Sequence, residues 1–464
     1  MKSCMHLLVF FLLLIKTTSS QKTIKTLPGY PGPLPFKLET GYISVGEHDE
    51  KQLFYYFIES EGDPETDPLM FWLTGGPGCS GFSGLVIEIG PLTFDLATFD
   101  GSFPSFNINP YSWTKAASII FIDAPVGTGF SYSNTPKSYP IYDTQSAKDN
   151  YMFLRKWLMK HPKFLKNRLY VAGDSYGGRI TPMVALEIAK GNEAGLQPRM
   201  LLQGYIVGNP VTNDNDINER VPYAHRMALI SDEYFQLAKS SCHGNYVDPD
   251  PNNYKCLYAL QLVKKCTNGI SNVQILEPKC AFLSPKPNDL LSSPVFIEDD
   301  PVDFLSLSKQ GRPWCRNYNY VPTYIWANND TVQEVLGIRK GTVPDWKRCK
   351  KTLSYESDVA TATKYHQLLN EKGFQALVYS GDHDMIVPYM STREWIRNFN
   401  LNVDDKWRPW YVGGQVAGYT EKYKNVNQAY ITFATVKGGG HTAPEYKPKE
   451  CLAMIDRWLS LSPL

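Results

Sequence analysis

Ser175 stands between two glycines in the stretch Gly173-Asp174-Ser175-Tyr176-Gly177, a spacing that suits a catalytic nucleophile. An apolar run that predicts a strand precedes this stretch, and a helical pattern follows it. A G-x-S-x-G motif between a strand and a helix is typical of a sharp turn that lifts the serine hydroxyl clear of a sheet. A side chain at either glycine would collide with the neighbouring strand or helix. We therefore predict that Ser175 is a catalytic nucleophile.

A serine hydroxyl is a weak nucleophile until a base takes its proton, so a histidine and an acid are also needed. Where the serine lies on such a strand-to-helix turn, the acid follows it along the chain and the histidine comes last. Asp382 and Asp384 both follow an apolar run at residues 376–379, and both qualify as the acid. His441 is the only histidine after them, and it lies in a glycine-rich loop. The alternative for His441 is an ordinary histidine of a surface loop.

A second glycine-rich loop could stabilise the charge that develops during attack by the serine. Thr74-Gly75-Gly76 follows the apolar run at residues 69–73. Backbone N–H groups of such a loop can point at the negative oxygen of a tetrahedral intermediate. The N–H of Tyr176, directly after the nucleophile, is the expected second donor. The alternative is that the glycines only form a tight turn.

The elements that must position these residues alternate between strands and helices. Apolar runs predict strands at residues 53–58, 69–73, 118–122, 169–172, 201–207, 376–379 and 431–436. A helical spacing of apolar residues covers residues 144–160. This alternation predicts an α/β fold, and the serine on a strand-to-helix turn points to the α/β-hydrolase fold: a mixed, mostly parallel sheet with helices on both faces.

The middle of the chain departs from this pattern. Residues 212–322 carry many Asn, Asp and Pro residues and five cysteines, and strand signals fade there. We predict that this region is an insertion that caps the active end of the sheet, within one domain over residues 21–464. The alternative is an independent second domain.

The N-terminus has the features of a secretory signal peptide. Lys2 precedes an apolar run at residues 7–15, and small residues at 17–20 suit cleavage. Eight cysteines follow residue 20, and none forms a C-x-x-C pair. Disulfides are therefore a better prediction than a zinc site, and we expect no metal and no cofactor. Asn329 in Asn-Asp-Thr is the one N-glycosylation sequon.

The charge balance excludes two classes of partner. The 464 residues carry 47 basic and 46 acidic side chains, so no net positive field exists to attract nucleic acid or an anionic membrane. No second apolar stretch is long enough to cross a bilayer. We expect a small-molecule or peptide substrate, no nucleic acid, and no membrane association once the signal is removed.

Several stretches together resemble the serine carboxypeptidase family over nearly the whole mature chain. They are the segments at residues 34–42, 72–80, 125–132, 173–178, 381–388 and 438–442. The resemblance implies Ser175 as nucleophile, Asp384 rather than Asp382 as the acid, and His441 as base. It also implies Gly76 and Tyr176 as backbone donors of the oxyanion hole.

The same resemblance implies a disulfide framework and a location. It pairs Cys79 with Cys349, Cys242 with Cys256, and Cys280 with Cys315. Some relatives are cut within the loop that matches residues 284–312, which makes this loop a candidate processing site. The family likeness implies the secretory pathway, with the vacuole or the cell exterior as destination.

Two residues depart from the pattern of the family's peptidases. Those enzymes usually carry Glu before the nucleophile and Asn before the paired glycines, and with a further acidic residue these groups bind a peptide's C-terminal carboxylate. This chain has Asp174 and Thr74 at those positions, with Glu88 as the further acid. Together with Gly75 they are the expected substrate-binding residues. Aspartate is one methylene shorter than glutamate, so its reach is reduced by roughly one C–C bond.

The aspartate before the serine resembles the plant serine carboxypeptidase-like acyltransferases. Those proteins take an acyl group from a glucose ester and pass it to another hydroxyl through the same acyl-serine. Acyl transfer is thus our first hypothesis, and release of C-terminal amino acids from peptides is the second. A third is a non-catalytic binding protein on a hydrolase scaffold. A simpler role for Asp174 is to cap the helix that follows the serine.

Overall fold

The computed structural model describes residues 21–280, 285–287 and 315–464. The predicted signal peptide at residues 1–20 lies outside these residues, as does most of the candidate processing loop at residues 284–312. Within the described ranges, no helix is long and apolar enough to cross a bilayer, and no group of His, Cys, Asp and Glu side chains could hold a metal ion.

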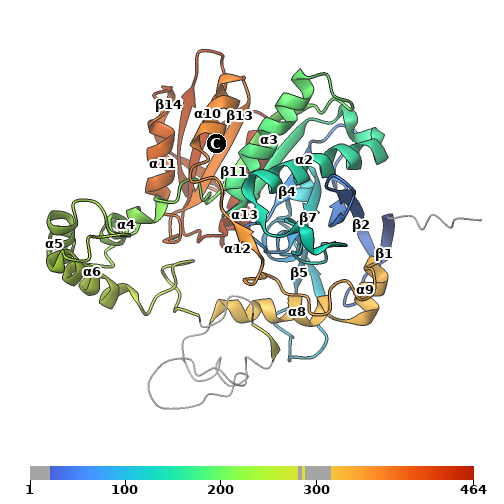
Figure 1. Cartoon of the computed structure of the whole chain (residues 1–464), viewed down its shortest axis with the longest axis horizontal. Helices are drawn as coiled ribbons and strands as arrows, with labels where there is room; N and C mark the ends of the chain where they lie inside the picture. Colours follow the sequence, from blue (N-terminus) through green and yellow to red (C-terminus); the bar gives the residue numbers. More distant parts are fainter. Residues whose placement is uncertain (1–20, 281–284, 288–314) are drawn as a thin grey trace, which may run out of the picture.

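A twelve-stranded sheet runs through the molecule (Figure 1). Its strand order is β1-β2-β3-β7-β4-β10-β11-β13-β16-β15-β14, and β8 pairs with β3 outside this path. The strands are β1 (Gln21–Thr26), β2 (Pro33–Val45), β3 (Lys51–Ile58), β4 (Leu69–Leu73), β7 (Ser118–Ile122), β8 (Tyr132–Ser133), β10 (Leu169–Asp174), β11 (Leu202–Gly208), β13 (Gln375–Gly381), β14 (Asn402–Val412), β15 (Gln415–Lys424) and β16 (Tyr430–Val436).

The centre of the sheet is parallel and its two sides are antiparallel. Neighbouring strands from β7 to β16 pair in parallel, whereas β1 to β3 and β14 to β16 pair antiparallel. Every residue of β4, β7 and β10 is buried. Burial on both faces explains why these strands are continuous apolar runs in the sequence. The mixed α/β sheet and all seven predicted strands are confirmed.

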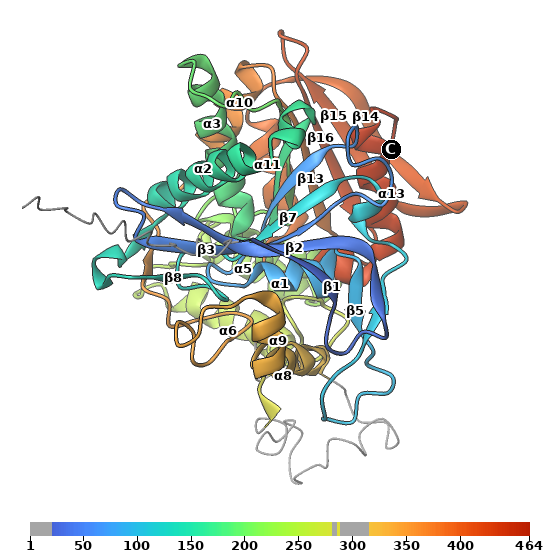
Figure 2. The same cartoon turned by 90° about the vertical axis from the view of Figure 1, so that its right-hand side faces the viewer.

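Helices cover both faces of the sheet. On one face α2 (Asp143–Lys160) and α3 (Gly177–Glu193) lie side by side, and α10 (Thr363–Glu371) and α11 (Tyr389–Arg397) join the same core. On the other face α13 (Pro448–Leu459) and the short α1 (Gly81–Ser83) pack in a second core (Figure 2). The predicted helix at residues 144–160 corresponds to α2.

The longest connection between two strands of the main sheet lies between β11 and β13. Its first helices, α4 (Arg220–Arg226), α5 (Asp232–Cys242) and α6 (Tyr254–Thr267), share a small core of their own that includes Met385. In Figure 1, α5 and α6 project away from the sheet. The later helices, α8 (Val321–Ala327) and α9 (Asp330–Leu336), pack in the core that also holds α13.

Three disulfides hold parts of the chain that are distant in sequence or belong to different helices. Cys79 is joined to Cys349, Cys242 to Cys256 between α5 and α6, and Cys280 to Cys315. These are the three pairs that the family resemblance implies. Of the cysteines in the described ranges, two are free: Cys266 is exposed, and Cys451 is buried in α13.

Candidate functional site

Ser175 lies on a strained turn between β10 and α3. Its φ of 51° is in the left-handed region, which a residue other than glycine rarely adopts. A Cβ added to Gly173 would lie 2.5 Å from the carbonyl oxygen of Leu73, and one added to Gly177 would lie 2.1 Å from the same atom. Both glycines of the motif are thus required by their close approach to β4, as the sequence predicts.

Ser175, His441 and Asp384 form a hydrogen-bonded chain. The Oγ of Ser175 is 2.7 Å from Nε2 of His441, and Nδ1 of the same imidazole is 2.8 Å from Oδ2 of Asp384. His441 follows β16, and its backbone N–H donates to the carbonyl of Val273 at 2.7 Å. Val273, which lies between β11 and β13, therefore holds the loop that carries the histidine.

Asp382 is placed for a different purpose. Its Oδ1 accepts a 2.6 Å hydrogen bond from the N–H of Gly438 in the loop before His441. Asp384, in contrast, is completely buried and accepts the N–H of Ile386 at 2.7 Å on Oδ1. The structure thus brings Asp384, and not Asp382, to the imidazole.

The surroundings favour the protonated imidazole. Burial alone would lower the pKa of His441, but the charge and hydrogen bond of Asp384 outweigh it, and the pKa is raised above its ordinary value. An imidazole with a raised pKa is a stronger base toward the Ser175 hydroxyl. The arrangement can therefore move a proton from serine to histidine.

Asn209 is a site residue that the sequence reasoning missed. Its Nδ2 donates to Oδ2 of Asp384 at 2.8 Å, and its Oδ1 accepts the N–H of Gly381 at 3.2 Å. It has a φ of 43° directly after β11. A signal was present in the sequence: an Asn-Pro pair at the carboxyl end of a predicted strand, where ligands bind in open α/β sheets.

The glycine loop lies directly against the nucleophile. A Cβ added to Gly75 would be 2.6 Å from Cβ of Ser175 and 3.0 Å from the backbone nitrogen of Tyr176. Gly76 has a φ of 120°, which suits glycine. Among the described residues, neither the N–H of Gly76 nor that of Tyr176 donates to a protein acceptor. Both predicted oxyanion donors are thus available beside Ser175.

Asp174 binds the glycine loop and does not cap the following helix. Its Oδ1 accepts the N–H of Gly75 at 3.1 Å. The N-cap of α3 is Tyr176, which makes no side-chain capping bond. Among the described residues, the hydrogen bond of the Asp174 side chain thus goes to the glycine loop and not to the first turn of α3. Burial, opposed by His441 and the Gly75 N–H, raises the pKa of Asp174 to about 6.

Two further buried carboxyls extend this group, because Glu88 lies near both Asp174 and Glu445. Burial together with the charges of Asp174 and Glu445 raises the pKa of Glu88 well above its ordinary range. Burial also raises the pKa of Glu445, which accepts hydrogen bonds from Tyr320 and Thr442. Glu88 is buried, and the charge of Arg348 opposes the rise in its pKa. A group of carboxyls that repel one another favours partial protonation, which turns some of them into hydrogen-bond donors.

Thr74 keeps its hydroxyl hydrogen available. Its Oγ1 accepts the indole N–H of Trp72 at 3.2 Å.

The sequon residue Asn329 lies elsewhere, as the N-cap of α9, where its Oδ1 accepts the N–H groups of Thr331 and Val332.

The sequence is similar to known proteins over nearly its whole length. Residues 28–461 match the family model described as serine carboxypeptidase. "Serine carboxypeptidase-like 17" of Arabidopsis thaliana is 47% identical over 460 residues, which cover 99% of this chain and 97% of that protein. "Serine carboxypeptidase-like 7" of the same plant is 46% identical over 459 residues, covering 99% and 98%.

A solved structure supports the fold. A prohormone-processing carboxypeptidase from Saccharomyces cerevisiae superposes with a TM-score of 0.69 at 18% identity, covering 94% of each chain. At that identity the likeness concerns the fold alone. The match of the family model over most of the sequence and the two plant relatives decide the family: the chain belongs to the serine carboxypeptidase family.

Proposed function

We propose that this protein is a serine-nucleophile enzyme that works through an acyl-Ser175 intermediate. The observation that carries the proposal is the unbroken chain of hydrogen bonds from Ser175 Oγ through His441 to Asp384. Nε2 of His441 takes the serine proton while Oγ bonds to the acyl carbon. The N–H groups of Gly76 and Tyr176 bind the resulting oxyanion.

Departure of the leaving group forms the acyl-serine, and a second nucleophile then completes the cycle. His441 gives its proton to the leaving oxygen or nitrogen as the bond to the acyl carbon breaks. A second nucleophile then attacks the acyl carbon while His441 takes the proton of that nucleophile. His441 gives this proton to Oγ of Ser175 as the bond between Oγ and the acyl carbon breaks. Water gives hydrolysis, whereas an alcohol gives acyl transfer.

We propose acyl transfer from a 1-O-glucose ester to a hydroxyl of a plant metabolite as the main reaction. The support is the pair of departures at Asp174 and Thr74. The Asp174 carboxyl is bonded to the Gly75 N–H at 3.1 Å, so it is turned toward the glycine loop. Because the aspartate side chain is one methylene shorter than that of glutamate, Asp174 reaches less far toward a peptide carboxylate.

Release of C-terminal amino acids is the second candidate. The observation that favours it is the buried carboxyl pair of Glu88 and Asp174, whose pKa values are both raised. A protonated carboxyl of this pair could donate a hydrogen bond to a peptide carboxylate at acid pH.

We also propose that the insertion at about residues 212–322 caps the site and that the mature protein is secreted or vacuolar. The cap is supported by the contacts of residues 272–275 with the loops that carry Asp384 and His441. The three disulfides fit the secretory pathway.

One set of reactions separates these hypotheses. The purified protein is incubated with a hydroxycinnamoyl-glucose and an alcohol acceptor, and separately with blocked dipeptides, with Ser175→Ala as control. Acyl transfer predicts ester product with little amino acid released, and peptidase activity predicts the reverse. No product from either, together with no labelling of Ser175 by a fluorophosphonate, would indicate a non-catalytic protein.

A further inference from the structure

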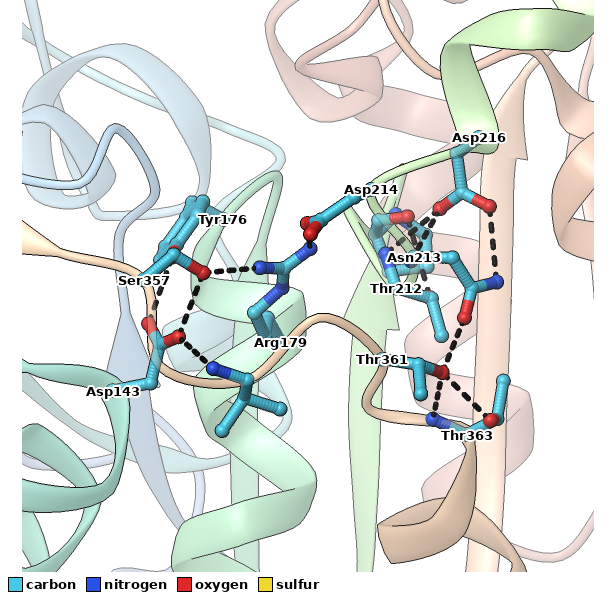
Figure 3. Close-up of polar contacts among 12 residues, drawn as sticks. Asp143, Tyr176, Arg179, Thr212, Asn213, Asp214, Asp216, Ser357, Thr361 and Thr363 are labelled. Carbon is cyan, nitrogen blue, oxygen red and sulfur yellow. Dashed lines mark hydrogen bonds and ion pairs between the residues drawn. The ribbon is translucent and has the colours of Figure 1, made fainter.

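The side chain of Tyr176, which follows the nucleophile, is tied to a polar network behind the site (Figure 3). Its hydroxyl donates to Oδ1 of Asp143 at 2.7 Å. Its ring meets the ring of Tyr355 edge-on, with the centroids 5.8 Å apart. The guanidinium of Arg179 lies over the same ring, 5.1 Å from its centroid. The position of Tyr176 is therefore fixed from three sides.

Asp143 is the centre of this network. It is the first residue of α2 and is completely buried. Besides the hydroxyl of Tyr176, it accepts the hydroxyl of Tyr355 at 2.6 Å, the hydroxyl of Ser357 at 3.0 Å and the N–H of Val359 at 3.1 Å. A buried carboxylate with four donors is held rigidly, because each bond restricts the same two oxygens.

Arg179 extends the network toward the surface. It is 1% exposed, and it donates to Oγ of Ser357 at 2.8 Å and to Oδ1 of Asp214 at 2.7 Å. Ser357 in turn donates to Asp143, so the arginine supports the carboxylate through one hydroxyl (Figure 3). Helices α2 and α3 and the segment after β12 (Tyr355–Glu356) are linked in this way.

The rigidity matters because of what the backbone of Tyr176 is expected to do. Its N–H is the proposed second oxyanion donor, and its nitrogen follows a serine with a φ of 51°. A strained turn relaxes unless its surroundings hold it. Donors to an oxyanion must lie within about 2.7–3.1 Å of the oxygen, so a small rotation of this peptide would cost much of the stabilisation.

We propose that Asp143 is a positioning residue that holds the Tyr176 N–H in the oxyanion hole through the Tyr176 hydroxyl. This inference rests on the proposed acyl-serine chemistry. Asp143 touches no reacting atom, so its loss should lower kcat and leave KM nearly unchanged. Removal of an oxyanion donor costs about 10²–10³-fold, and misplacement of one should cost roughly ten- to hundredfold.

The test compares Asp143→Asn with Asp149→Asn. Asp149 is also a buried carboxylate of α2, but it pairs with Lys51 and Gln145 away from Ser175. Both variants should lose thermal stability, but only Asp143→Asn should lower kcat and slow fluorophosphonate labelling of Ser175. Tyr176→Phe, which removes one hydroxyl, should give a similar loss in kcat and serves if Asp143→Asn fails to fold.

The double variant gives a second readout. Because Asp143→Asn and Tyr176→Phe break the same contact, their effects on kcat should not multiply. Equal kcat in the wild type and in a folded Tyr176→Phe or Asp143→Asn variant would overturn the inference, as would equal losses in Asp143→Asn and Asp149→Asn. If the wild type itself is not labelled at Ser175, the proposed function fails instead.

Discussion

Replacement of Asp384 by asparagine should disable the site by reversing the tautomer of His441. Oδ1 of Asp384 accepts the backbone N–H groups of Ile386 and Val387, so the amide oxygen of an asparagine should take that position. Its NH₂ group then faces Nδ1 of His441, which must become an acceptor. The imidazole proton moves to Nε2, and Nε2 can no longer take the proton of Ser175.

We expect a fall in kcat of roughly 10⁴, which corresponds to about 5.5 kcal/mol of transition-state free energy. The loss is enlarged by a second conflict, because the new NH₂ would also face the amide NH₂ of Asn209, now 2.8 Å from Oδ2. Initial rates with the better substrate and a thermal melt of each variant measure the effect.

Asp382→Asn is the matched control, two residues away. Its carboxylate accepts Gly438 N–H and does not bond His441, so we expect less than a tenfold change in kcat. A folded Asp384→Asn protein that keeps more than a tenth of wild-type kcat would refute the assignment. So would a larger loss at Asp382 in a protein that melts like the wild type.

Three other predictions concern Asp174, Thr74 and Asn329. Asp174→Glu with Thr74→Asn should raise the ratio of peptide hydrolysis to acyl transfer, most clearly below pH 6; a constant ratio between pH 4 and 8 would contradict the proposed role of Asp174. Because the pKa of Asp174 is raised to about 6, its protonation stabilises the fold at low pH, and this contribution is lost as pH rises from about 4 to 6. The melting temperature of Asp174→Asn should therefore fall less than that of the wild type as pH rises over that interval. An equal fall in both proteins would disprove the link between Asp174 protonation and stability. Asn329→Gln should lose both a glycan and the N-cap of α9, and loss of the cap should lower the free energy of unfolding by about 0.5–2 kcal/mol. Thr331→Ala should lose only the glycan. Equal mass of the wild type before and after glycosidase treatment would show that the sequon is unused.

The strands at the centre of the sheet were predictable because they are buried on both faces. Residues 69–73 are apolar throughout and residues 118–122 are apolar after Ser118, and each segment is a strand with those bounds in the structure. The antiparallel strand β14 is mostly exposed, β15 mixes exposed and buried residues without a regular alternation, and both carry charged side chains. Their sequence therefore lacks the apolar run that marks the central strands, and they were missed.

The site was predictable where a motif or an order along the chain identifies a residue. Ser175 follows from its glycines and His441 from its position, but Asp384 could be separated from Asp382 only through the family resemblance. Asn209 and Asp143 act through contacts with residues more than 30 positions away. Such contacts arise from the packing of strands and helices. The Asn-Pro pair at the end of a predicted strand was a local signal for Asn209, whereas no local pattern marks Asp143.

Direct observation of an acyl group on Ser175 tests the central claim most closely. The wild-type protein is mixed with a hydroxycinnamoyl-glucose without acceptor, quenched in acid within seconds, and digested for peptide mass spectrometry. The account predicts a peptide that contains Ser175 and carries the mass of the acyl group, lost when an alcohol acceptor or water is allowed to react, and absent in Ser175→Ala. An acyl group on another residue, or turnover of any substrate by Ser175→Ala at the wild-type rate, would contradict it.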